Sequence, residues 1–82
     1  MYKAKVYVTL KEGILDPQGA IIGKALDSLG YKNVGNVRVG KFIQLELEGT
    51  DKAKLNKQVD EMSHRLLSNP VIESYTFELG EE

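Results

Sequence analysis

The chain has 82 residues, of which 41% are hydrophobic and 28% charged, so it suits one small globular domain spanning residues 1–82 and is too short for two. Eleven basic residues against twelve acidic ones give a formal net charge of -1, which argues against nucleic acid and anionic membrane as partners. The chain has no cysteine, which excludes disulfides, thiolate metal sites and cysteine nucleophiles. We find neither a signal peptide nor an apolar run long enough to span a bilayer, and we therefore expect a cytoplasmic protein.

The N-terminal part of the sequence predicts a strand followed by a helix. Apolar and polar residues alternate from Tyr2 to Leu10, which is typical of a strand with one buried face. Asp16 before Pro17 is a helix start, because the carboxylate can accept backbone N–H bonds and proline lacks a donor that would otherwise stay unpaired. Apolar residues at helical spacing, with Gly30 as a left-handed cap, predict a helix from Pro17 to Leu29.

The C-terminal part predicts two strands, a second helix and a last strand. Val37 and Val39 alternate with Arg38, and Gly40 is interpreted as a hairpin turn before a strand from Ile43 to Leu47. Thr50 is the predicted cap of the second helix, which Asn69-Pro70 ends. Its apolar residues form one narrow stripe: Leu55, Val59, Met62 and Leu66. The last strand is predicted from Val71 to Leu79.

The order of these elements predicts the fold class. Two strand-helix-strand crossovers joined by a hairpin give an α+β, ferredoxin-like βαββαβ sandwich. Its four-stranded antiparallel sheet would carry both helices on one face and leave the other face bare.

Two motifs that could indicate chemistry have simpler explanations. Residues 35–41 match a phosphate-binding loop up to its lysine, but Phe42 stands where that loop needs Ser or Thr, and a strand rather than a helix is predicted to follow. His64, the only histidine, falls on the solvent side of its helix, where Asp60 would give a metal only a second ligand. We therefore expect no catalytic residue, no bound cofactor and no metal.

The bare sheet face is the predicted place of contact with other proteins. Tyr7 and Phe42 would project from it among opposed charges, a mixture that favours a protein partner over RNA. Gly19 and Gly23 lie four residues apart on the first helix, where either another subunit or the sheet itself could approach closely. The candidate interface residues are Tyr7, Arg38, Phe42, Gln44, Ile72, Gly19 and Gly23. We expect a homodimer or a higher homo-oligomer, formed through this face or through an edge strand.

Five strings carry a resemblance to a known family: VYVTLK (6–11), GILDPQG (13–19), ALDSLGY (25–31), VRVGKFIQLEL (37–47) and LLSNPVIE (66–73). Together they resemble the PurS family, the small subunit of phosphoribosylformylglycinamidine synthase. The resemblance covers nearly the whole chain, in order and with the family's spacing.

The resemblance implies a role in de novo purine biosynthesis. In that family a large synthetase subunit uses ATP, and a glutaminase subunit releases ammonia. The small subunit has no catalytic residue of its own; it is a dimeric adaptor that joins the other two and assists ammonia transfer. The alternative is a free-standing ferredoxin-like regulatory module that binds a small molecule.

Overall fold

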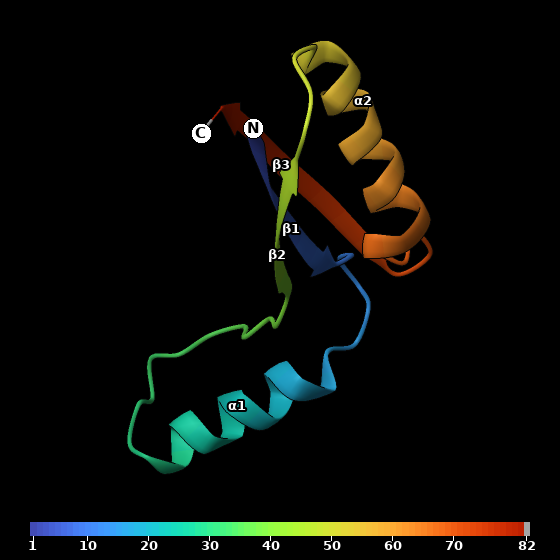
Figure 1. The fold of residues 1–82 in the computed structure, drawn as a ribbon. Helices are drawn as coiled ribbons and strands as arrows, with labels where there is room; N and C mark the ends of the chain where they lie inside the picture. The colour runs from blue at the N-terminus through green and yellow to red at the C-terminus, as the bar shows by residue number, and fades with distance from the viewer. Residues whose placement is uncertain (82) are drawn as a thin grey trace.

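The computed structural model describes residues 1–81, which form a three-stranded antiparallel sheet with two α-helices. The elements follow in the order β1 (Tyr2–Leu10), α1 (Pro17–Ser28), β2 (Lys41–Leu47), α2 (Lys52–Met62), the π-helical turn η1 (Ser63–Leu67) and β3 (Glu73–Glu81). The strand order is β2-β1-β3, so the first strand lies in the centre (Figure 1).

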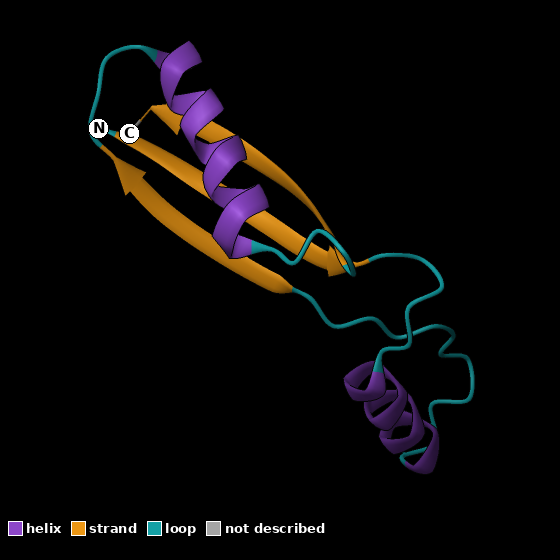
Figure 2. Ribbon diagram, turned by 90° about the vertical axis from the view of Figure 1, so that its right-hand side faces the viewer, coloured by secondary structure: helices purple, strands orange, loops and turns teal. Residues whose placement is uncertain are grey.

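The hydrophobic core lies between the sheet and α2, which crosses one face of the sheet (Figure 2). The predicted alternation of β1 is confirmed, since Ala4, Val6 and Val8 are at most 1% exposed. Leu55 and Val59 of α2 pack against them, and the inward residues of β2 and β3 surround this cluster. The hydroxyl of Tyr75 on β3 donates a 2.7 Å hydrogen bond to the carboxylate of Asp60, which ties the outer strand to the helix.

The predicted four-stranded sheet with both helices on one face is wrong. Residues 34–40 form a connection outside the sheet, and β2 begins only at Lys41. No hairpin forms at Gly40, because no strand precedes it there. The alternating valines nevertheless have a physical reason. A side chain on Gly19 would overlap the carbonyl oxygen of Val37, so this segment packs against α1, and the N–H of Val39 donates to Asp16.

The first helix projects away from the sheet instead of covering it (Figures 1 and 2). We call residues 11–40, which comprise α1 and its two connections, the arm. The radius of gyration is 16.4 Å, whereas a compact domain of this length would have about 12 Å. The arm accounts for this elongation, since the molecule extends 51 × 27 × 14 Å.

The second helix differs from its prediction in its start and in its buried stripe. Asp51, not Thr50, is the N-cap, and its carboxylate accepts from the N–H groups of Ala53 and Lys54. Leu55 and Val59 are buried as expected, but Met62 and Leu66 are 37% and 82% exposed. The π-helical turn changes the spacing, so that Ser63 and Leu67 continue the stripe at intervals of four. The hydroxyl of buried Ser63 bonds the carbonyl of Val59 at 2.8 Å.

Gly40 should be required for a close approach of two backbones rather than for a turn. A Cβ at this position would lie 2.5 Å from the carbonyl oxygen of Val8, so Gly40→Ala should lower the free energy of unfolding by about 1–3 kcal/mol. Gly35→Ala is the matched control, because a Cβ there meets nothing within 4 Å and should change stability by less than about 0.5 kcal/mol. Urea unfolding at equal protein concentrations measures both, and equal stabilities of the two variants would contradict the packing.

Candidate functional site

The described residues 1–81 contain no group of three metal-ligating His, Asp or Glu side chains. His64 is exposed in η1, and the nearby Asp60 carboxylate is engaged by Tyr75. The segment with the partial phosphate-loop motif is extended and leads into β2, so it presents no helix N-terminus to a phosphate. None of the helices in this part of the chain is long and apolar enough to cross a bilayer.

The open face of the sheet, opposite α2, carries an exposed aromatic pair. The rings of Tyr7 and Phe42 stack with centroids 5.1 Å apart, because the two residues are direct partners in the β1–β2 register. Gln44 follows Phe42 on the same face, opposite Lys5. Tyr7 is 38% and Phe42 54% exposed, so the structure brings these three predicted interface residues together on an accessible surface.

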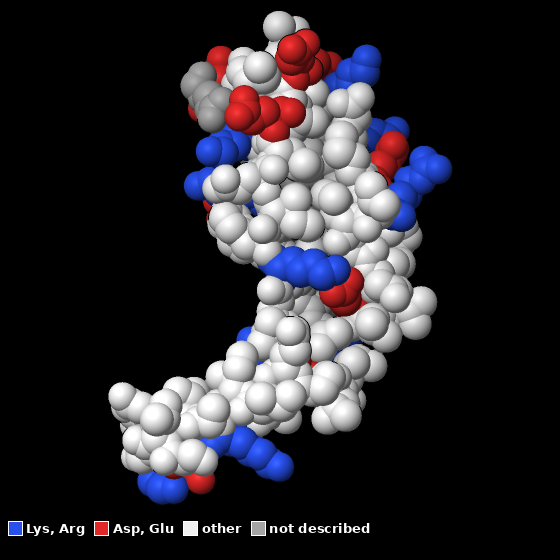
Figure 3. Space-filling model, turned by 60° about the horizontal axis from the view of Figure 1, so that its bottom comes forward, with Lys and Arg blue, Asp and Glu red and all other residues white. Residues whose placement is uncertain are grey.

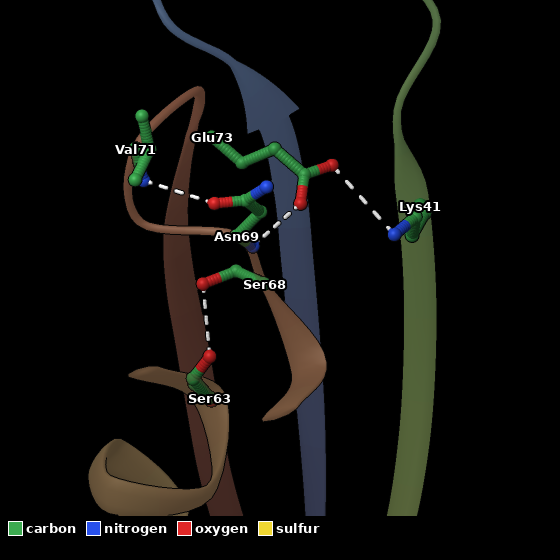
Figure 4. Close-up of polar contacts among 6 residues, drawn as sticks. All are labelled: Lys41, Ser63, Ser68, Asn69, Val71 and Glu73. Atoms are coloured by element: carbon green, nitrogen blue, oxygen red, sulfur yellow. Dashed lines mark hydrogen bonds and ion pairs between the residues drawn. The ribbon is translucent and has the colours of Figure 1, made fainter. Parts of the chain in front are cut away.

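Ile72 does not lie in the sheet. It precedes β3, and its carbonyl accepts a 2.8 Å hydrogen bond from the N–H of Lys11, which fixes the start of the arm to the end of the sheet. The turn before it is held by hydrogen bonds of Asn69 with Val71 and Glu73 (Figure 4). The Glu73 carboxylate also lies 3.7 Å from the ammonium of Lys41, which links the two outer strands (Figure 4).

The arm exposes most of its apolar side chains. Gly19 is the only buried residue of α1. Six large hydrophobic residues of the arm are 42–80% exposed: Leu15, Ile21, Ile22, Leu29, Tyr31 and Val34. In the view of Figure 3 the arm extends from the body with a largely uncharged surface. An isolated helix of 12 residues is marginally stable in water, so α1 needs contacts that its own sheet does not provide.

The base of the arm contains the most concentrated set of polar contacts with the returning chain. The Asp16 carboxylate accepts from the N–H of Gly19 at 2.8 Å and from the N–H of Val39 at 2.7 Å. The Arg38 guanidinium donates to the carbonyl oxygens of Lys11 and Ile14 on the outgoing connection and to that of Leu10, the last residue of β1. Gly19 and Gly23 both face Val37 of the same chain, but only Gly19 permits a close approach, because a Cβ on Gly23 would make an ordinary contact at 3.8 Å.

Asp16 was predicted only as a helix cap, and its second role has no signal in the sequence. The N–H bonds from Val39 and Gly19, assisted by the positive charge of Arg38, lower the pKa of the Asp16 carboxyl below its ordinary value, although burial opposes this effect. Asp16 is 7% exposed, and its lowered pKa favours the charged form of the carboxylate. Arg38, a predicted interface residue, lies beside it at the base of the arm.

These features define a class of protein: a small α+β chain with an aromatic open sheet face and a projecting arm. The family model described as phosphoribosylformylglycinamidine (FGAM) synthase, PurS, matches residues 3–81. The chain therefore belongs to the PurS family of purine biosynthesis.

Individual relatives agree with this assignment over almost the whole chain. The PurS subunit of phosphoribosylformylglycinamidine synthase from Bacillus subtilis is 49% identical over 99% of this chain and 95% of its own length. A solved B. subtilis PurS chain matches with a TM-score of 0.90, covering 99% of this chain and all of that one. A chain in the structure of PurLQS from Thermotoga maritima matches at 32% identity with a TM-score of 0.87, covering 96% of each chain.

The lowered pKa of Asp16 predicts how stability depends on acid. A carboxyl with a lower pKa in the folded than in the unfolded chain stabilises the fold above its unfolded pKa of about 4, and this contribution is lost as the pH falls through the folded pKa. Asp16→Asn should therefore be less stable than the wild type at neutral pH, and the difference should shrink in acid. Urea unfolding over a pH series measures this change.

Asp27→Asn is the control for this series, because it removes only an exposed ion pair, 3.2 Å long, with Lys32. It should follow the wild type closely at every pH. A stability deficit of Asp16→Asn that stayed constant down to about pH 3 would contradict the assigned role of the carboxylate.

Proposed function

We propose that the chain is the non-catalytic small subunit of phosphoribosylformylglycinamidine synthase, where it joins the synthetase and glutaminase subunits and assists ammonia transfer between them. The observation that carries this proposal is its likeness, over 96% of its length, to a chain in T. maritima PurLQS.

If the chain assists ammonia transfer, its removal should affect the reaction with glutamine as nitrogen source more than the reaction with added ammonia. Leaving this chain out of the reconstituted enzyme should lower amidine formation from glutamine strongly, and formation from added ammonia less, because free ammonia bypasses the transfer. Steady-state assays of the enzyme with and without the chain measure both rates, and the isolated chain should have neither glutaminase nor ATPase turnover. Equal losses with both nitrogen sources would instead indicate a role in the synthetase site.

We also propose that the chain is a homodimer or a higher homo-oligomer in which a second copy covers the apolar side of α1, in place of the open sheet face or the edge strand that the sequence led us to expect. The accessible surface is 6093 Å², against about 4,900 Å² for a compact chain of this mass. The excess is larger than the area of about 800 Å² that each partner contributes to a standard interface. Six large hydrophobic side chains of the arm lie on this exposed surface, as expected for a surface that is covered in the assembly.

A second copy suits this surface for two reasons. On the inward face of β2, Leu47 is buried in the core, but Ile43 and Leu45 are only half-buried, at the position where the expected fold would have placed its first helix. Each chain thus offers both an uncovered helix and a partly uncovered strip of sheet, and exchange of identical elements is a common route to dimers. The net charge of -1 opposes self-association very little.

Charge substitutions on the two surfaces should separate self-association from binding to the other subunits. Ile22→Asp places a charge on the exposed apolar side of α1 and should produce monomers, whereas Gln18→Asp, a charge on the same helix at an exposed polar position, should not. Phe42→Asp on the open sheet face should keep the oligomer and weaken binding to the synthetase. Sedimentation velocity and a pull-down measure these outcomes, and an Ile22→Asp variant that stays oligomeric would exclude the arm from the contact.

A further inference from the structure

The direction of α1 is set by few contacts, which lie at its base and along its N-terminal half. The helix is joined to the sheet by two connections, residues 11–16 and 29–40, that have no regular secondary structure. Neither β1 nor α2 buries the apolar side chains of this helix. Without an additional restraint, α1 could turn about these two connections as a rigid body.

Asp16 restrains the connection that returns to the sheet. One carboxylate oxygen caps the helix by accepting from Gly19, and the other accepts the N–H of Val39, which lies 23 residues further along the chain. Hydrogen bonds to a charged carboxylate are stronger than those between neutral groups. A single side chain therefore joins the first turn of α1 to Val39, which lies two residues before the start of β2.

Arg38, on the returning connection, forms hydrogen bonds with the outgoing one. Its Nη1 donates to the carbonyl of Ile14 at 2.9 Å, and its Nη2 to the carbonyls of Lys11 at 3.0 Å and Leu10 at 3.4 Å. The planar guanidinium can serve these acceptors together, which a lysine ammonium with one nitrogen cannot do in the same geometry. Each connection thus contributes one side chain that binds the backbone of the other: Asp16 from the outgoing connection and Arg38 from the returning one.

Close packing of backbone completes this junction. Gly19 lies so near the carbonyl of Val37 that a side chain would not fit, and a Cβ on Gly23 would contact a methyl group of Val37 at 3.8 Å. The solved B. subtilis chain matches 99% of this chain with a TM-score of 0.90, a value that a differently directed arm would prevent.

We propose that Asp16 and Arg38 are positioning residues for assembly: they form a clamp that fixes the direction of α1, holds it away from its own sheet and so commits its apolar side to a second chain. The final part of this inference rests on the homo-oligomer proposed above, whereas the clamp itself is a property of one chain. The clamp therefore predicts a change in arm position that can be measured separately from association.

Two aspartates at helix starts provide a matched comparison. Asparagine caps helices about as well as aspartate, so Asp16→Asn keeps the bond from Gly19, but its amide nitrogen cannot accept the N–H of Val39. Asp51→Asn is the control, because both backbone donors of that cap bond the same oxygen and the carboxylate joins no other segment. Arg38→Lys tests the other half of the clamp with the charge retained.

Arm position can be measured by spin labels, since the chain has no natural cysteine. One label is placed on α1 through Lys24→Cys and one on α2 through Lys57→Cys, because both positions are exposed. The pair reports the distance between arm and body within one chain when labelled chains are diluted with unlabelled ones. Asp16→Asn and Arg38→Lys should broaden the distance distribution, while Asp51→Asn and the clamp-intact chain should keep it narrow. Hydrogen exchange of β1 should stay unchanged, which separates this effect from unfolding of the sheet.

Association is measured on the same variants by analytical ultracentrifugation. Breaking either half of the clamp should raise the dissociation constant of the homo-oligomer by at least about tenfold, the loss expected from one charge-assisted hydrogen bond. A narrow distribution and an unchanged constant in both clamp variants would overturn the inference. A wild type that is monomeric yet has a narrow distribution would overturn the homo-oligomer and leave the clamp in place.

Discussion

The Asp16 carboxylate is the interaction on which the unusual part of this structure depends. It joins the N–H of Gly19, at the start of α1, to the N–H of Val39, just before β2. A helix cap normally organises only its own helix, but here the second oxygen also determines where the chain returns to the sheet. Arg38 reinforces the junction by binding carbonyl groups of the outgoing connection. Together these contacts replace the helix-on-sheet packing that positions α1 in an ordinary split βαβ fold.

The arm has a thermodynamic consequence for so small a protein. The core consists of seven buried hydrophobic residues from the sheet and α2, and none of them belongs to the arm. Ordering the arm costs conformational entropy, and α1 recovers little of it through burial of its own side chains. Contacts with another chain supply the missing burial in the proposed assembly. In that assembly, folding of the arm would be coupled to association of the chain, whereas the sheet and α2 have a core of their own.

The sequence predicted most elements but not their arrangement, for a physical reason. Alternation from Tyr2 to Leu10 and from Ile43 to Leu47 located two strands correctly, and Asp16 marked the start of α1. The same alternation at Val37 and Val39 indicated a strand, yet those residues pack against α1 instead of joining the sheet. Periodicity tells which side of a segment is covered and not what covers it. The stripe on α2 failed at Leu66 because a π-helical turn, which periodicity does not reveal, changes the spacing.

The sequence likewise indicated only part of the candidate site. Pairing of Tyr7 with Phe42 follows from alternation on neighbouring strands, and the structure brings their rings into a stack. The second bond of Asp16 depends on Val39 approaching from 23 residues away, which no local pattern encodes. Both partners nevertheless lie in strings that carry the resemblance to PurS, GILDPQG and VRVGKFIQLEL. These strings therefore have a structural meaning of their own: they contain the residues that join the two connections of the arm, and in the proposed assembly they determine which surface another chain would reach.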